Sequence, residues 1–181
     1  MKGIVFTEFV ALVEETWGLK CVDDLIGIVN PESGGAYTSV GTYKYAELVS
    51  YITALSERTG IDASTLILTF GKYLAKAFMK QYPGYFRDAG DLFSLLKSID
   101  NHIHIEVQKL SPNAMLPSIT YEEQDENTLI LHYQSQRQLA DLAHGLILSC
   151  AEFYATEIDI ERISISSIPI TKERFTIRKI G

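Results

Sequence analysis

Apolar residues recur every three or four positions through the first two-thirds of the chain, a spacing typical of helices that bury one face. A first helix is predicted to end near Gly18, and a second, shorter one to stop at Pro31. The residues that follow, PESGGA at 31–36, favour a turn. The apolar positions of these two helices are Ile4, Val5, Phe9, Leu12 and Val13 in the first, and Cys21, Leu25 and Ile28 in the second.

Three more helices are predicted before the character of the sequence changes. One spans about residues 45–60, and the next starts at a cap formed by Asp62 or Ser64 and breaks at the Pro-Gly pair of residues 83–84. A long helix is expected over about residues 91–110, where seven apolar side chains share one face. These are Leu92, Leu95, Leu96, Ile99, Ile103, Val107 and Leu110.

The last third of the chain has the composition of strands arranged around one helix. Residues 128–136 are expected to pair with the segment around Ile119, and the acidic YEEQDEN at 121–127 is expected to form the solvated loop between them. The remaining predicted elements are a helix over 137–155 and strands over 158–170 and 175–180.

Helices followed by a small antiparallel sheet with one helix across it predict an α+β fold. At 181 residues the chain is long enough to bury a sizeable core. We therefore expect a single domain over residues 1–181, with a helical part over about 1–62 and a second part over about 63–181 that holds the sheet.

Composition and charge exclude several classes of protein. The 16 Lys and Arg residues against 23 Asp and Glu give a net charge of −7, which argues against binding to nucleic acid or to an anionic membrane surface. No apolar run approaches the roughly 20 residues of a membrane helix. Cys21 and Cys150 lie far apart and are predicted to be buried, reduced thiols. The expected location is the cytoplasm.

Short catalytic motifs such as GxSxG, HExxH, CxxC and a phosphate-binding glycine loop are not present. Among the histidines, the neighbouring His102 and His104 suggest a metal site. Two helical positions that are two residues apart point about 200° away from each other, so at most one of these side chains can bind a given ion. Periodicity does not choose between them.

A second candidate site is the Y-x-S-x-R sequence of Tyr133, Ser135 and Arg137. On a strand these alternate residues project from one face. A guanidinium can grip a carboxylate through two hydrogen bonds, and the two hydroxyls add neutral donors. The pattern therefore predicts an anion clamp, although the polar face of an edge strand would look the same.

Together these features resemble the H-NOX family, the haem nitric oxide/oxygen-binding domains, in its bacterial stand-alone form. The resemblance covers essentially the whole chain. It rests on the MKGIVF start, the YTSVGTY segment, the HIEVQKL sequence that begins at His104, Pro117, and the Y-x-S-x-R motif at the expected separation.

The resemblance implies a haem b group held between the helical part and the sheet part. His104 is then the ligand of the haem iron, and Tyr133, Ser135 and Arg137 clamp the propionates. Pro117 is expected to press on the macrocycle and distort it. The residues expected to line the pocket are all apolar: Val5, Phe9, Leu74, Phe78, Leu142 and Leu146.

The resemblance also bears on the choice of gas. Relatives that hold O₂ place a tyrosine at the position of Leu142, with polar support at the positions of Phe9 and Leu74. A hydrogen bond to bound O₂ contributes about 1.5–3 kcal/mol, or roughly 10- to 150-fold in affinity, whereas bound NO depends little on such a donor. We therefore expect selectivity for NO, with CO as a further ligand.

The implied function is a gas sensor without enzymatic activity, which signals to a separate protein such as a histidine kinase or a cyclic-di-GMP enzyme. A structural zinc site like that of some relatives is not expected, because the C-terminal stretch lacks Cys and His. Two alternatives are a haem-free module of the same fold that binds an apolar ligand or a protein, and a redox or peroxidase-like haem protein. The second alternative is disfavoured because no distal acid or base can be placed.

Overall fold

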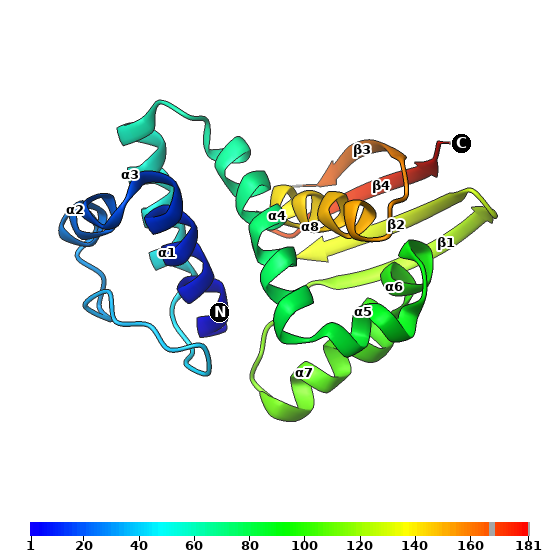
Figure 1. The fold of residues 1–181 in the computed structure, drawn as a ribbon, viewed down its shortest axis with the longest axis horizontal. Helices are drawn as coiled ribbons and strands as arrows, with labels where there is room; N and C mark the ends of the chain where they lie inside the picture. The colour runs from blue at the N-terminus through cyan, green and yellow to red at the C-terminus, as the bar shows by residue number, and fades with distance from the viewer. Residues whose placement is uncertain (167–168, 181) are drawn as a thin grey trace.

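The computed structural model describes residues 1–166 and 169–180, and its N-terminal helices lie apart from its sheet (Figure 1). The helices are α1 (Gly3–Trp17), α2 (Leu19–Val29), α3 (Tyr45–Thr59), α4 (Ala63–Gln81), α5 (Pro83–Ala89), α6 (Leu92–Ser98), the π-helix η1 (Ile99–Ile103), α7 (His104–Leu110) and α8 (Ala140–Phe153). The strands are β1 (Ser118–Asp125), β2 (Thr128–Ser135), β3 (Ile158–Ser166) and β4 (Thr171–Lys179). In Figure 1, α1 to α3 gather on one side of α4, and the sheet and α8 lie on the other.

The four strands form one antiparallel sheet in the order β1-β2-β4-β3. Two hairpins make up the sheet, and α8 connects them by crossing one face (Figure 1). This arrangement confirms the predicted α+β fold with a helix across a small antiparallel sheet.

Two hydrophobic clusters make up the core. The first joins α1, α2, α3 and α4 around side chains such as Phe6, Leu48 and Phe70, which are almost fully buried. The second joins the sheet to α5, α6 and α8 around Leu129 and Phe175. The side chains of α4 thus pack in the cluster of the N-terminal helices, and the same helix also lies in close contact with α8.

The acidic segment is not a loop, and the prediction of one was wrong. Residues 118–125 form β1, and only Glu126 and Asn127 make the turn to β2. Asn127 N–H donates to the Asp125 side chain at 2.8 Å, which closes this turn. Because β1 is an exposed edge strand, its carboxylates remain in water. Glu122 and Glu123 also pair with His132 and Lys97.

The predicted long helix over 91–110 is also corrected. It is one helical rod in three parts, in which the π-helix Ile99–Ile103 separates α6 from α7. The expected face is buried through Leu96 only, and Leu110 is 87% exposed. Two smaller corrections concern α5, which was not predicted, and α8, which begins at Ala140 rather than near residue 137.

The start of α1 is held by the loop that contains the YTSVGTY sequence. The N–H groups of Gly3 and Ile4 donate to the carbonyls of Gly41 and Ser39 at 2.8 and 3.0 Å. These are free donors of the first helical turn, which need partners outside the helix. A Cβ at residue 3 would lie 1.8 Å from the Thr38 carbonyl oxygen, so only glycine fits this contact. The loop thereby fixes the position of α1.

Two glycines allow α4 and α8 to approach backbone to backbone. A Cβ at Gly71 would lie 2.3 Å from the Leu142 carbonyl oxygen, and one at Gly145 would lie 2.1 Å from the Leu68 carbonyl oxygen. These distances are far below van der Waals contact, so neither site accepts a side chain without a shift of the helices.

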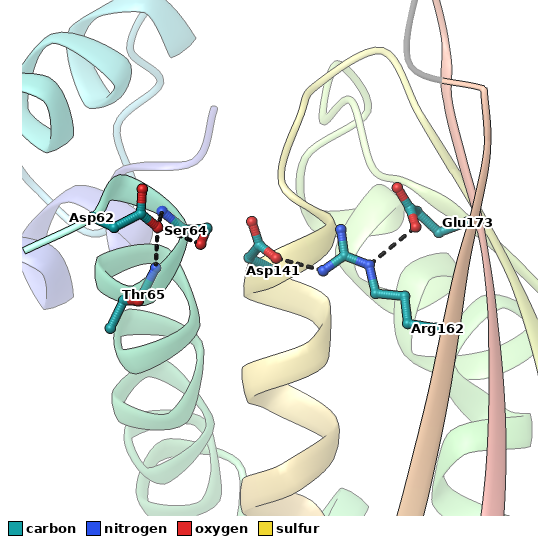
Figure 2. Close-up of polar contacts among 6 residues, drawn as sticks. All are labelled: Asp62, Ser64, Thr65, Asp141, Arg162 and Glu173. Carbon is teal, nitrogen blue, oxygen red and sulfur yellow. Dashed lines mark hydrogen bonds and ion pairs between the residues drawn. The ribbon is translucent and has the colours of Figure 1, made fainter.

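Asp62 fixes the start of α4 by accepting from Ser64 N–H at 3.0 Å, as predicted (Figure 2).

An ion-pair network joins the first turn of α8 to the sheet (Figure 2). Arg162 on β3 bonds Asp141 on α8 and reaches the buried Glu173 on β4, with Nε to Oε2 at 3.0 Å. Although burial favours the neutral form of the guanidinium, its hydrogen bonds to Glu173 and Asp141 outweigh that effect and raise the pKa of Arg162. The network therefore holds the N-terminal end of α8 against the sheet.

His144 gives the protein a predicted pH dependence of stability. Burial, and then the charge of Arg162, lower the pKa of this half-buried imidazole, and nearby Asp141 offsets this only in part. Because the unfolded imidazole titrates near 6.5, the unfolded chain takes up the proton first as the pH falls. We expect thermal stability to fall below about pH 6.5. In melting curves measured at pH 5–8, the melting temperature of His144→Gln should fall less steeply below about pH 6.5 than that of the wild type. His102→Gln, at an exposed histidine, is the control. Equal pH dependence of the melting temperature in all three proteins would contradict the assignment to His144.

Among residues 1–166 and 169–180, no helix combines the length and the apolar character needed to cross a membrane.

Candidate functional site

The first candidate residue, His104, opens α7 directly after the π-helical turn. Its Nδ1 lies 2.7 Å from Oδ1 of Asp100, and the other oxygen of this carboxylate accepts from Ser118 Oγ at 3.3 Å. The side chains of His104 and Asp100 are 16% and 28% exposed. Within the described residues Nε2 of His104 has no hydrogen-bond partner. The imidazole is therefore fixed at one nitrogen and available at the other.

His102 lies in different surroundings. It is exposed, and its ring meets the ring of Tyr85 edge to face at 5.6 Å. The hydrogen bond to Asp100 and the half-buried environment belong to His104 alone. The structure thus separates two histidines that periodicity could not distinguish.

Tyr133, Ser135 and Arg137 lie where β2 ends, but only the first two belong to the strand. The Arg137 N–H donates to Ser135 Oγ at 3.0 Å, which turns the chain out of the strand. The prediction that all three project from one strand was therefore wrong for Arg137. Tyr133 is buried, and this burial raises the pKa of its hydroxyl.

The side chain of Arg137 connects the sheet part to the helical part. Its Nη1 donates to the Met115 carbonyl at 3.1 Å, and its guanidinium carbon lies 5.7 Å from the ring centre of Tyr45, the first residue of α3. Burial lowers its pKa, and the phenols of Tyr45 and Tyr133 offset this in part. Within the described ranges, no carboxylate lies within ion-pair distance of this cation. A half-buried arginine without a carboxylate is unusual in a chain of net charge −7.

The six predicted apolar residues come together in one place. They belong to the hydrophobic cluster of the N-terminal helices, and Phe78 also packs against the cluster of the sheet. Phe9 and Leu74 are 2% exposed, and the other four are partly buried. The members are Val5 and Phe9 on α1, Leu74 and Phe78 on α4, and Leu142 and Leu146 on α8.

Pro117 lies in the segment between α7 and β1, immediately before Ser118, and is partly buried. This segment leaves the end of α7 and leads to the sheet (Figure 1). Pro117 is thus next in sequence to a residue that bonds Asp100. Its pressure on a macrocycle stays a prediction.

Three residues that contact the candidate residues were not predicted from the sequence. Asp100 stands four residues before His104, a spacing that places helical side chains on one face and could have drawn attention to it. Tyr45 and Ser118 carry no local signal, because they reach the site from elements that are distant along the chain.

Comparisons with known proteins agree with this picture. A family model described as Haem-NO-binding matches residues 2–162. The Fe(II) unliganded H-NOX protein from K. algicida is 36% identical, with a TM-score of 0.93 over 100% of this chain and 97% of that chain. The Fe(II)NO H-NOX protein from S. oneidensis, 24% identical over 100% of both chains, shows the same fold with a TM-score of 0.90. A search of curated proteins finds no match.

The two kinds of likeness reinforce each other. The family match spans most of the chain, and the K. algicida structure follows it over its whole length at a substantial identity. The chain therefore belongs to the Haem-NO-binding family, the H-NOX domains.

Proposed function

We propose that this chain binds haem b at His104 and senses NO there. The observation that carries the proposal is a pair of groups that suit one ligand: the fixed imidazole of His104, and the half-buried guanidinium of Arg137, which has no carboxylate partner among the described residues. Haem would satisfy both, because it brings one iron that takes a neutral imidazole and two propionates that take cations and hydroxyls.

The residues of this site fit haem. His104 would hold the iron through Nε2, and Arg137, Tyr133 and Ser135 would hold the propionates. The six apolar side chains predicted to line the pocket would cover the haem ring. When bound at His104, haem would supply a ferrous iron that can take up NO.

The apolar side chains would set the choice of gas. Phe9, Leu74 and Leu142 carry no hydrogen-bond donor, and all three pack in one hydrophobic cluster. Since bound O₂ needs a donor more than NO does, these three side chains favour NO. The output would pass to a separate signalling protein, for which a histidine kinase or a cyclic-di-GMP enzyme is the expectation.

Absorption spectra of the haem-reconstituted, reduced protein test this function. We expect a haem spectrum that changes on addition of NO and shows no stable O₂-dependent change in air. Protein that takes up no haem would support the alternative of a haem-free module. A stable change in air would overturn the selectivity, and turnover of peroxide would favour a redox enzyme.

Removal of the Arg137 guanidinium should weaken haem retention. Arg137→Ala leaves the propionates without their cation, and a charged hydrogen bond contributes about 1.5–3 kcal/mol. Haem transfer to excess apomyoglobin should therefore become roughly 10- to 150-fold faster at unchanged circular dichroism. Arg58→Ala removes an exposed arginine that pairs with Asp24 and should leave the rate unchanged. Equal rates in wild type and Arg137→Ala would remove the clamp from the proposal.

A further inference from the structure

We propose that Asp100 and Ser118 are positioning residues for the iron ligand, which fix the tautomer of His104 and set the strength of its bond to iron. This inference rests on the proposed function, because it assumes that His104 is the ligand of haem. It concerns two residues that the Y-x-S-x-R and HIEVQKL motifs do not include.

Asp100 makes hydrogen-bond contacts with both His104 and Ser118. The 2.7 Å contact between Asp100 Oδ1 and His104 Nδ1 is short, as expected when the acceptor is a carboxylate. Ser118 Oγ donates to the second oxygen at 3.3 Å, which restricts rotation of the carboxylate. The other acidic side chain near His104, Glu106, pairs instead with Lys109 at 2.7 Å. Asp100 is therefore the carboxylate that acts on the imidazole.

The second step is the local backbone. In the π-helix the His104 N–H donates to the Ile99 carbonyl, five residues earlier, instead of to residue 100. This wider turn changes the register between α6, which is buried against the sheet, and α7, which contains no buried residue. Asp100 lies inside the turn and His104 follows it, so the backbone feature and the hydrogen bond coincide. Single π-helical turns occur frequently at functional sites.

The third step is the chemistry. A carboxylate that accepts from Nδ1–H keeps the proton on Nδ1 and leaves the lone pair on Nε2, the nitrogen that faces the metal. It also makes the imidazole a stronger electron donor. We infer that Asp100 strengthens the iron–histidine bond and so opposes its loss when NO binds. Through Ser118, the same carboxylate links α7 to the first residue of β1.

The haem-free protein allows a test that does not depend on haem. ¹⁵N NMR of the imidazoles at a pH where they are neutral should show His104 with its proton on Nδ1. Asp100→Ala should shift His104 toward the Nε2–H form, and Glu106→Gln should leave its tautomer unchanged. A wild-type His104 with its proton on Nε2 would overturn the inference.

The haem-loaded protein gives the second readout. We expect the iron–histidine stretching frequency, measured by resonance Raman on the reduced protein, to fall in Asp100→Asn and in Ser118→Ala, with the larger change in Asp100→Asn. Haem affinity should drop about 10- to 100-fold in Asp100→Ala, as is typical when such a partner is removed. Glu106→Gln is again the matched control.

The outcomes separate the two proposals. Wild-type protein that takes up no haem would overturn the proposed function, and this inference with it. Wild-type protein that binds haem, with the same stretching frequency in Asp100→Asn and Ser118→Ala, would overturn the inference alone. Since Asn has the shape of Asp and residue 118 begins an exposed edge strand, these two variants are expected to fold.

Discussion

His104→Gly is expected to give a folded protein that no longer retains haem and regains it when imidazole is added. Free imidazole can occupy the space of the lost ring and donate its nitrogen to the iron in place of Nε2. The measurement is the haem absorbance per mole of protein before and after addition of about 10 mM imidazole. This concentration exceeds the dissociation constant of about 1 mM that is typical of a weak ligand. The expected loss is nearly complete, because His104 is the only proposed iron ligand.

His102→Gly is the matched control for this experiment. Both substitutions place glycine in the same helical rod, at a conformational cost of about 1 kcal/mol, and only one of them removes the imidazole that Asp100 holds. We expect His102→Gly to retain haem. If His102→Gly needs imidazole and His104→Gly does not, the iron ligand has been assigned to the wrong histidine.

Gly145→Ala is expected to give the second large effect, on stability and on the packing of α4 against α8. The new methyl group would lie 2.1 Å from the Leu68 carbonyl oxygen and 2.9 Å from the Lys72 nitrogen, both of which are backbone atoms. Backbone atoms cannot rotate away, so the helices must separate. Overpacking of this kind typically costs about 1–3 kcal/mol. Chemical denaturation should show the loss as a lower midpoint.

Gly27→Ala provides the comparison for this change. A Cβ at residue 27 of α2 has no atom within 4 Å, and alanine is preferred to glycine in helices by up to about 1 kcal/mol. We expect a small gain in stability there. If Gly145→Ala is as stable as the wild type, α4 and α8 can separate without a loss in the free energy of unfolding. Because Leu142 and Leu74 flank this crossing, a separated pair should also change the rate of NO binding.

Local patterns were sufficient for much of the fold. Apolar spacing located α1, α2, α3 and α4, because each of these helices buries one face and the spacing of that face is visible in the sequence. Composition located β2 and the approximate positions of β3 and β4, and it indicated the α+β class. The acidic stretch of β1 was misread as a loop, because an edge strand that is exposed on most of its length shows no apolar alternation.

Part of the candidate site was also visible in the sequence. The Y-x-S-x-R motif and the sequence after His104 singled out residues that lie at the end of β2 and at the start of α7. Sequence could not place Arg137 past the end of the strand, since that position depends on a hydrogen bond from its N–H to Ser135.

Periodicity and motif are properties of neighbouring positions, so the sequence predicted most of the helices, the strand that holds Tyr133 and Ser135, and the chemically distinctive residues. Which groups meet depends on the tertiary structure. The π-helical turn brings Asp100 to His104, and the start of β1 brings Ser118 to Asp100. The contact between Gly71 and Gly145 sets the distance between α4 and α8. The position of α3 places Tyr45 beside Arg137. Apart from the Asp100–His104 pair, these contacts join residues far apart in the chain, and their geometry follows from packing rather than from local pattern.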